Sequence, residues 1–74
     1  MNTPTPKKFA IMNLGHEFKI TIENPNSLTM AKAEAEQFGG IRENDRNSFY
    51  LQYRPTFDEK ELLSYLNEKL EEIL

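Results

Sequence analysis

The sequence predicts a small α+β domain in which two helices lie on one face of an antiparallel sheet of three or four strands. Short stretches of alternating apolar and polar residues are followed, twice along the chain, by a stretch with apolar residues at helical spacing. The length of 74 residues suits one domain rather than two. We therefore expect the order β-β-α-β-β-α, or β-β-α-β-α if the shortest strand stays unpaired.

The chain begins with a predicted tail and a predicted β-hairpin. Residues 1–6 carry two Thr-Pro pairs and are interpreted as a flexible tail, and residues 7–74 as the single domain. Residues 9–12 are apolar, and residues 17–23 alternate between apolar and polar side chains. Because the gap between them contains Asn and Gly, which tolerate the positive φ of tight turns, we expect these two strands to form a hairpin.

A helix is predicted over residues 28–38. This stretch contains no Gly or Pro and is rich in Ala, Glu and Lys, which favour helices. Ser27 is the expected N-cap, and Gly39-Gly40 is expected to end the helix in a left-handed turn. Small Ala residues on the buried side would let this helix approach the sheet closely.

The second half of the chain repeats the same order of elements. Residues 41–43 are expected to form a short strand, residues 44–47 a turn, and residues 48–54 an alternating strand. An arrangement with the first helix crossing behind a hairpin, as in a β-grasp, is a variant that the sequence does not distinguish.

The last predicted helix runs to about the end of the chain. Thr56 and Glu59 match the capping-box spacing, with Thr56 as N-cap. The apolar stripe of this helix consists of Leu62, Leu66, Leu70 and Ile73, widened by Leu63 and Leu74.

The sequence predicts no catalytic or metal site. It has no cysteine and one histidine, His16, in a predicted turn, whereas metal sites and general bases need partners at defined spacing. Gly39-Gly40 follows a helix, while a phosphate-binding loop precedes one. Residues 44–47 lack the spacing and closing Glu of a calcium loop. We therefore expect no enzyme and no cofactor.

Composition also limits the partners and the compartment. The absence of cysteine favours a reducing environment, and no apolar run is long enough for a signal peptide or a membrane span, so a cytoplasmic location is expected. A formal net charge of −3 is unfavourable for duplex DNA, because that affinity comes mostly from Lys and Arg on phosphates.

The main hypothesis is a non-enzymatic protein-interaction module. Size and acidity favour a small regulator or inhibitor of a larger complex, of the type found in phages and mobile elements. Tyr and Arg are enriched in protein–protein hot spots. The candidate contact residues, on the solvent face of the sheet and in the loop before it, are Lys19, Arg42, Arg46, Tyr50, Gln52 and Arg54. The acidic face of the last helix is a second candidate surface.

Two alternatives remain open at this stage. A single-stranded nucleic-acid binder would stack bases on Tyr50 and use the charges of Arg54, Lys19 and Lys7-Lys8. A homodimer with a structural or assembly role would instead pack through the last helix, because small domains often complete a thin core by oligomerising. Its candidate contact residues are Leu63, Leu70 and Leu74.

Overall fold

In the computed structural model, which describes residues 8–74, four strands and two helices follow one another in the predicted order. The predicted tail over residues 1–6 lies outside the described residues. The elements are β1 (Phe9–Asn13), β2 (Phe18–Ile22), a 3₁₀ turn η1 (Pro25–Ser27), α1 (Leu28–Glu36), β3 (Gly39–Asp45), β4 (Ser48–Tyr53) and α2 (Glu59–Ile73).

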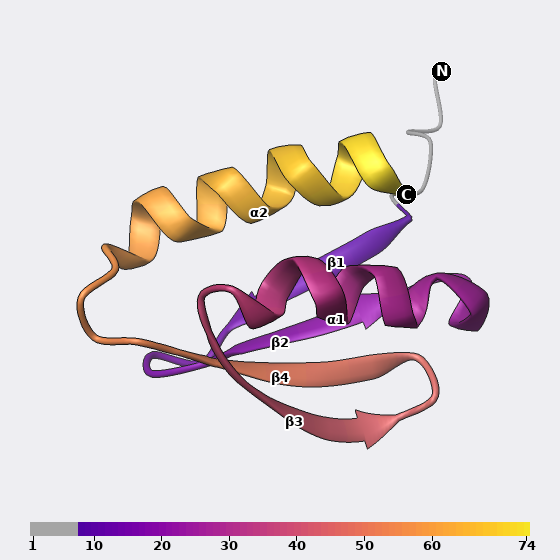
Figure 1. Ribbon diagram of the computed structural model, residues 1–74, viewed down its shortest axis with the longest axis horizontal. Helices are drawn as coiled ribbons and strands as arrows, with labels where there is room; N and C mark the ends of the chain where they lie inside the picture. Colours follow the sequence, from indigo (N-terminus) through magenta and orange to yellow (C-terminus); the bar gives the residue numbers. More distant parts are fainter. Residues whose placement is uncertain (1–7) are drawn as a thin grey trace, which may run out of the picture.

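The strands form an antiparallel sheet in the order β1-β2-β4-β3. The second hairpin places β4 beside β2, so β2 and β4 lie at the centre and β1 and β3 at the two edges. Both helices lie on the same side of the sheet, with α2 running along β1 and α1 packed on β3 and β4 (Figure 1). The expected layered arrangement is therefore confirmed, and the other face of the sheet carries neither helix.

The core lies between the sheet and the two helices. Alternate residues of the central strands point into it, as the period of two requires. On α1 the two buried positions are Ala31 and Ala35, and these small side chains let the helix approach the sheet, as predicted. The buried apolar residues are Phe9, Phe18, Ile20, Ile22, Ala31, Ala35, Phe49, Leu51, Leu62, Leu66 and Leu70.

The turn between β1 and β2 has the predicted chemistry. Gly15 has a φ of 96°, a backbone conformation that favours glycine. The Asn13 side-chain oxygen accepts a hydrogen bond from the Gly15 backbone N–H at 2.8 Å, and the Leu14 N–H donates to the Glu17 carbonyl at 2.9 Å. The turn brings Gly15 under Tyr53, whose hydroxyl donates to the Gly15 carbonyl at 3.0 Å.

The prediction that Gly39-Gly40 ends a helix was wrong. Neither glycine has a positive φ, and both belong to β3, which covers seven residues instead of the three expected. Gly39 lies directly opposite Tyr53, and a Cβ there would lie 2.7 Å from the Tyr53 Cα. The glycine is therefore needed for close strand pairing, and helix α1 ends earlier, at Glu36.

Of the two predicted N-caps, the position of Ser27 is confirmed and that of Thr56 was wrong. Ser27 is the N-cap residue of α1, as predicted, but its side chain forms no capping hydrogen bond. The Asn24 side chain accepts from the Asn26 N–H at 3.0 Å and caps the 3₁₀ turn. Helix α2 is capped by Asp58, which accepts from the Glu61 N–H at 3.3 Å. Thr56 lies before this cap, in a turn after β4.

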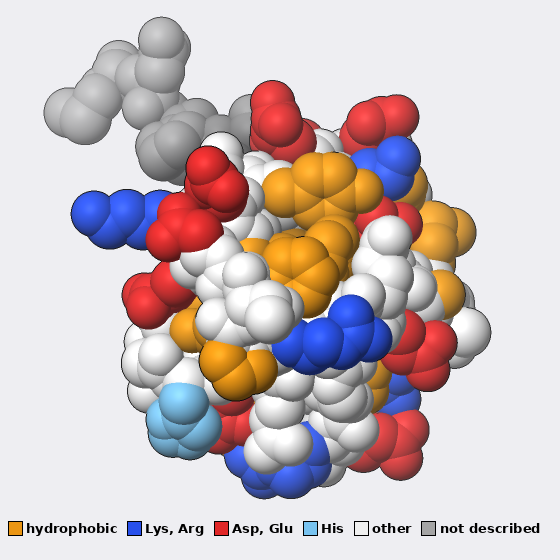
Figure 2. Space-filling model, turned by 60° about the vertical axis from the view of Figure 1, so that its left-hand side comes forward, with side chains coloured by type: hydrophobic (Ala, Val, Ile, Leu, Met, Phe, Trp, Pro, Cys, Tyr) orange, Lys and Arg blue, Asp and Glu red, His pale blue; other side chains and the backbone are white. Residues whose placement is uncertain are grey.

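That turn directs Phe57 back against α1. The Phe57 N–H donates to the Arg54 carbonyl at 3.0 Å, and the ring of Phe57 packs edge to face on Phe38 with centroids 5.3 Å apart. Phe38 makes a second edge-to-face contact with Tyr65 of α2, at 5.2 Å. Hydrophobic side chains remain visible at this end of the molecule (Figure 2).

Candidate interaction site on the open sheet face

Side chains from several strands meet on the face of the sheet that faces away from the helices. Lys19 of β2 lies opposite Tyr50 of β4, which in turn lies opposite Arg42 of β3. Met12 of β1 lies opposite Lys19 and is 59% exposed, and Gln52 follows two residues after Tyr50 on the same face. Directly opposed side chains are close neighbours, so these five residues, here called the open-face site, form one surface.

Arg42 is held in place by two neighbours. Its Nη2 donates to both carboxylate oxygens of Glu17, at 3.2 and 3.1 Å. Its guanidinium carbon lies 4.1 Å from the centroid of the Tyr50 ring, within the range of a cation–π contact. Arg42 thus keeps about half of its side chain exposed while its conformation is already ordered.

Glu17 is a residue of this candidate site that the sequence analysis did not include. It lies just before β2 and only 7% of its surface is exposed, although it lies on the open side of the sheet. The alternation of Glu17 with Lys19 and Thr21 could have placed it there. His16, the one histidine of the sequence, is mostly exposed, with its Nε2 3.8 Å from a Glu17 oxygen.

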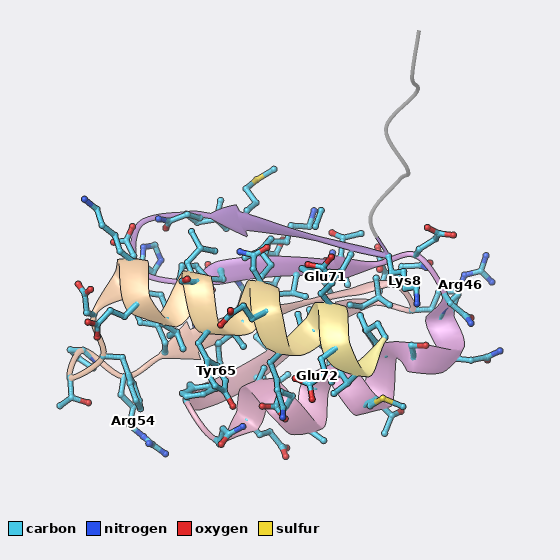
Figure 3. The ribbon with its side chains drawn as sticks, turned by 90° about the horizontal axis from the view of Figure 1, so that it is seen from above. Lys8, Arg46, Arg54, Tyr65, Glu71 and Glu72 are labelled. Atoms are coloured by element: carbon cyan, nitrogen blue, oxygen red, sulfur yellow. The ribbon has the colours of Figure 1, made fainter. Side chains whose placement is uncertain are left out.

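Two of the predicted contact residues, Arg46 and Arg54, lie outside the open-face site. Arg46 is in the turn between β3 and β4, and Arg54 follows β4, so the two lie at opposite ends of the molecule (Figure 3). The backbone N–H of Arg54 donates to the Phe38 carbonyl at 3.0 Å, and its Nη1 donates to the Gln37 carbonyl at 3.4 Å. Arg54 therefore contacts the residues that follow α1. It does not adjoin Tyr50, although the sequence analysis had placed the two residues on one surface.

The candidate dimer residues of α2 also separate. Leu70 has no exposed surface and belongs to the core, so it was wrongly placed among the surface candidates. Leu63 and Leu74 are half-buried and pack against the core from its margin. The sequence pattern shows which side of the helix is apolar. Which of its leucines are fully buried depends on how the helix is rotated against β1.

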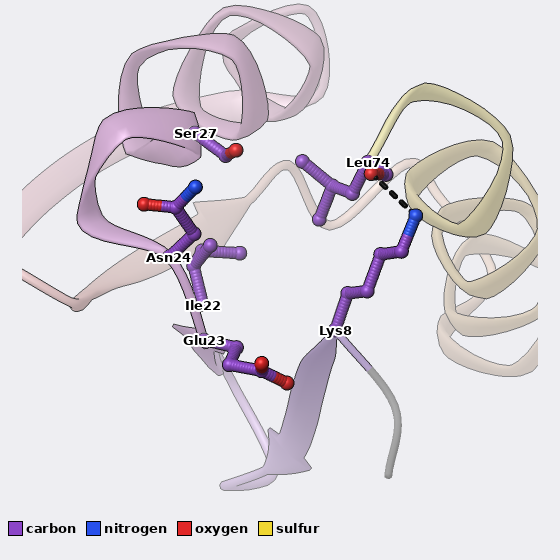
Figure 4. A pocket seen from close by; sticks show the side chains of 6 residues that line it. All are labelled: Lys8, Ile22, Glu23, Asn24, Ser27 and Leu74. Carbon is purple, nitrogen blue, oxygen red and sulfur yellow. Dashed lines mark hydrogen bonds between the residues drawn. The ribbon is translucent and has the colours of Figure 1, made fainter. Parts of the chain in front are cut away.

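A cavity of about 220 Å³ lies where β1, the end of β2 and the end of α2 meet (Figure 4). It is lined by Lys8, Ile22, Glu23, Asn24, Ser27 and Leu74. The Lys8 ammonium donates to the Leu74 backbone carbonyl at 2.7 Å, which joins the start of β1 to the end of α2. The position of the Lys8 side chain is therefore explained by a contact within the fold.

Two carboxylates of the second hairpin, Glu43 and Asp45, have a lowered pKa. The backbone N–H of Asn47, with the Ser48 hydroxyl, donates to Asp45 and lowers the pKa of Asp45. A hydrogen bond from Lys32, together with its charge, lowers the pKa of Glu43. Within residues 8–74, no three His, Asp or Glu side chains gather closely enough to hold a metal ion.

Comparisons of the chain with protein-family models, with curated proteins and with solved structures give no match. Among the described residues, neither helix has the length and apolar character needed to cross a membrane.

Proposed function

We propose that this chain is a non-enzymatic protein-interaction module, which binds a protein partner through the open-face site and acts as a small regulator or inhibitor of a larger complex. The observation that supports this most is the ordered Arg42, held between the buried carboxylate of Glu17 and the ring of Tyr50. Because the side chain is already ordered, little rotamer entropy is lost when a partner covers it.

The same contacts favour a protein over a single-stranded nucleic acid. Glu17 compensates the charge of Arg42, which reduces the attraction to phosphates. The guanidinium covers one face of the Tyr50 ring, where a base would have to stack. Arg54, the second cation of the nucleic-acid hypothesis, contacts the end of α1. An Arg and a Tyr beside the exposed Met12 and Gln52 suit a mixed polar and apolar protein interface.

The test is a pull-down with tagged full-length chain at about 0.15 M salt, where weak surface charge pairs are largely screened. The eluate is treated with nuclease and identified by mass spectrometry. Gln52→Arg inserts a bulky charge into the open-face site, while Gln37→Arg makes the same change at an exposed position after α1. We expect one stoichiometric protein with the wild type and Gln37→Arg, reduced about tenfold or more with Gln52→Arg.

Equal recovery with both variants would remove the open-face site from the interface. Recovery of nucleic acid, or of proteins lost on nuclease treatment, would favour the nucleic-acid hypothesis instead. Recovery of the chain alone, with a mass that rises with concentration, would favour the homodimer.

A further inference from the structure

A second surface lies on the helix side of the molecule, away from the open-face site. It consists of Met30, Phe38, Phe57 and Tyr65, here called the aromatic surface. Met30 is 50% and Tyr65 40% exposed, and Phe38 and Phe57 are half-buried. Figure 2 shows hydrophobic side chains exposed at the end of the molecule where α2 begins, with acidic and basic side chains beside them. Exposed Met and aromatic side chains are typical of binding surfaces.

The aromatic surface joins the two helices. The rings of Phe38 and Tyr65 are 5.2 Å apart, and the Tyr65 hydroxyl donates to a Glu34 oxygen of α1 at 3.0 Å. Met30, Glu34 and Phe38 follow one another at intervals of four residues, so they share one flank of α1 and its extension. That flank faces α2, because Glu34 and Phe38 both contact Tyr65. The surface is thus built into the fold and does not depend on a loose segment.

The rim of the aromatic surface is acidic. On α2, Glu61, Glu68 and Glu72 lie four residues before, three after and seven after Tyr65, which places them on the same side of the helix. Figure 3 shows Tyr65 and Glu72 on the side of α2 that faces α1, whereas Glu71 lies on the side of β1. With Glu34 of α1, four carboxylates lie along the two helices at this surface.

These carboxylates are largely uncompensated. None of the four forms an ion pair with a residue in 8–74. Two described cations lie near the surface: Lys69, whose charge acts on Tyr65, and Arg54, whose backbone bonds to Phe38 and Phe57. The hydrogen bond to Glu34, with burial and the charges of Glu34 and Glu72 adding to it, raises the pKa of Tyr65. The open-face site differs, because there the charge of Arg42 is paired with Glu17.

We propose that the aromatic surface binds a basic amphipathic segment of another protein, with apolar side chains on Met30, Phe38 and Tyr65 and Lys or Arg on the rim. Charge complementarity selects this occupant, since a partner of like charge would be repelled. A second copy docking through its own helices does not fit, because α1 and α2 each carry more acidic than basic residues. This interaction is separate from the function proposed above.

The probe is a synthetic helical peptide of Leu and Lys with apolar residues at positions i, i+3, i+4 and i+7, compared with the same peptide in which every Lys is Glu. Binding is followed by fluorescence anisotropy, and the contact surface is mapped by amide chemical shifts of the isotope-labelled chain. We expect saturable binding of the Lys peptide with shifts around Phe38 and Tyr65, and no binding of the Glu peptide.

Two neighbouring substitutions separate a specific surface from general charge attraction. Glu72→Lys and Glu71→Lys change the net charge equally and both replace exposed residues of α2, but only Glu72 faces α1. Both add a cation near the helix C-terminus, which favours the helix, so neither should unfold it. We expect Glu72→Lys to weaken binding roughly five- to tenfold, and Glu71→Lys less than about twofold.

Tyr65→Ala should also weaken binding, because it removes the central apolar contact. Equal weakening by the two Lys variants, equal binding of the Glu peptide, or shifts confined to the open-face site would each overturn the proposal. So would absence of binding to the Lys peptide, or a dimer of the chain in sedimentation that competes with the peptide.

Discussion

Replacing Gly39 by Ala is expected to destabilise the fold strongly, while the same replacement at the adjacent Gly40 is not. A Cβ at Gly39 would lie 2.7 Å from the Tyr53 Cα and 2.9 Å from the Gln52 carbonyl carbon, and closer still to the Gln52 carbonyl oxygen. These are backbone atoms of β4, so rotating a side chain cannot relieve the contact. A Cβ at Gly40 meets nothing within 4 Å.

The cost follows from the strand pairing. Overpacking costs about 1–3 kcal/mol, and since β3 and β4 must separate here we expect a value near the upper end, about 3 kcal/mol. A chain of 74 residues is stable by roughly 4–11 kcal/mol at about 0.05–0.15 kcal/mol per residue. At about 4–8 °C for each kcal/mol, Gly39→Ala should lower the Tm by roughly 12–24 °C.

The measurement is thermal and urea unfolding of both variants and the wild type, followed by circular dichroism. Both substitutions restrict the unfolded chain to the same extent, so that contribution cancels between them. Gly40→Ala should lie within about 1 kcal/mol of the wild type, because Ala costs less than Gly inside a strand. If Gly39→Ala were as stable as Gly40→Ala, the close pairing of β3 with β4 would be refuted.

Three further predictions concern the caps, the core and the pH dependence. Asp58→Ala should lower the free energy of unfolding in urea by about 1 kcal/mol through loss of the α2 cap, whereas Thr56→Ala should change it little. A larger loss with Thr56→Ala would show that Thr56 is the N-cap after all. Leu70→Ala should cost about 2–5 kcal/mol, or prevent folding, and Leu63→Ala clearly less, since only Leu70 is fully buried; equal costs would contradict the packing of α2. The folded-state pKa of Asp45 is lowered, so its stabilisation is present above the ordinary Asp range and is lost as the pH falls through the folded pKa. Asp45→Asn should therefore reduce the loss of stability as the pH falls below about 5, and an unchanged acid profile would show that Asp45 does not contribute.

Some features of this protein depend on local residue patterns, and these were predictable. The alternation of Phe18, Ile20 and Ile22 identifies β2, because a period of two leaves one face for the core. The Ala positions of α1 and the turn around Gly15 depend on residues within a few positions of each other. The order of elements, their approximate bounds and the placement of both helices on one face of the sheet follow from such patterns.

Other features depend on contacts between distant residues, and there the predictions from local sequence patterns were wrong. The Gly39-Gly40 pair is typical of a helix end. In the structure both glycines belong to β3, and Gly39 lies close to the backbone of Gln52 and Tyr53. Thr56 matches a capping box, but packing of Phe57 on Phe38 places the helix start later, after Asp58.

The candidate surfaces show the same division. Sequence alternation placed Lys19, Tyr50 and Gln52 on the open face, because neighbouring residues along a strand alternate between its two sides. Only the tertiary structure brought Glu17 to Arg42, at a separation of 25 residues. Likewise, only the packing of α2 on α1 joined Tyr65 to Phe38 and Glu34. Backbone periodicity is local and can be read along the chain, whereas strand register and helix rotation are set by packing of the whole core, and these decide which side chains meet.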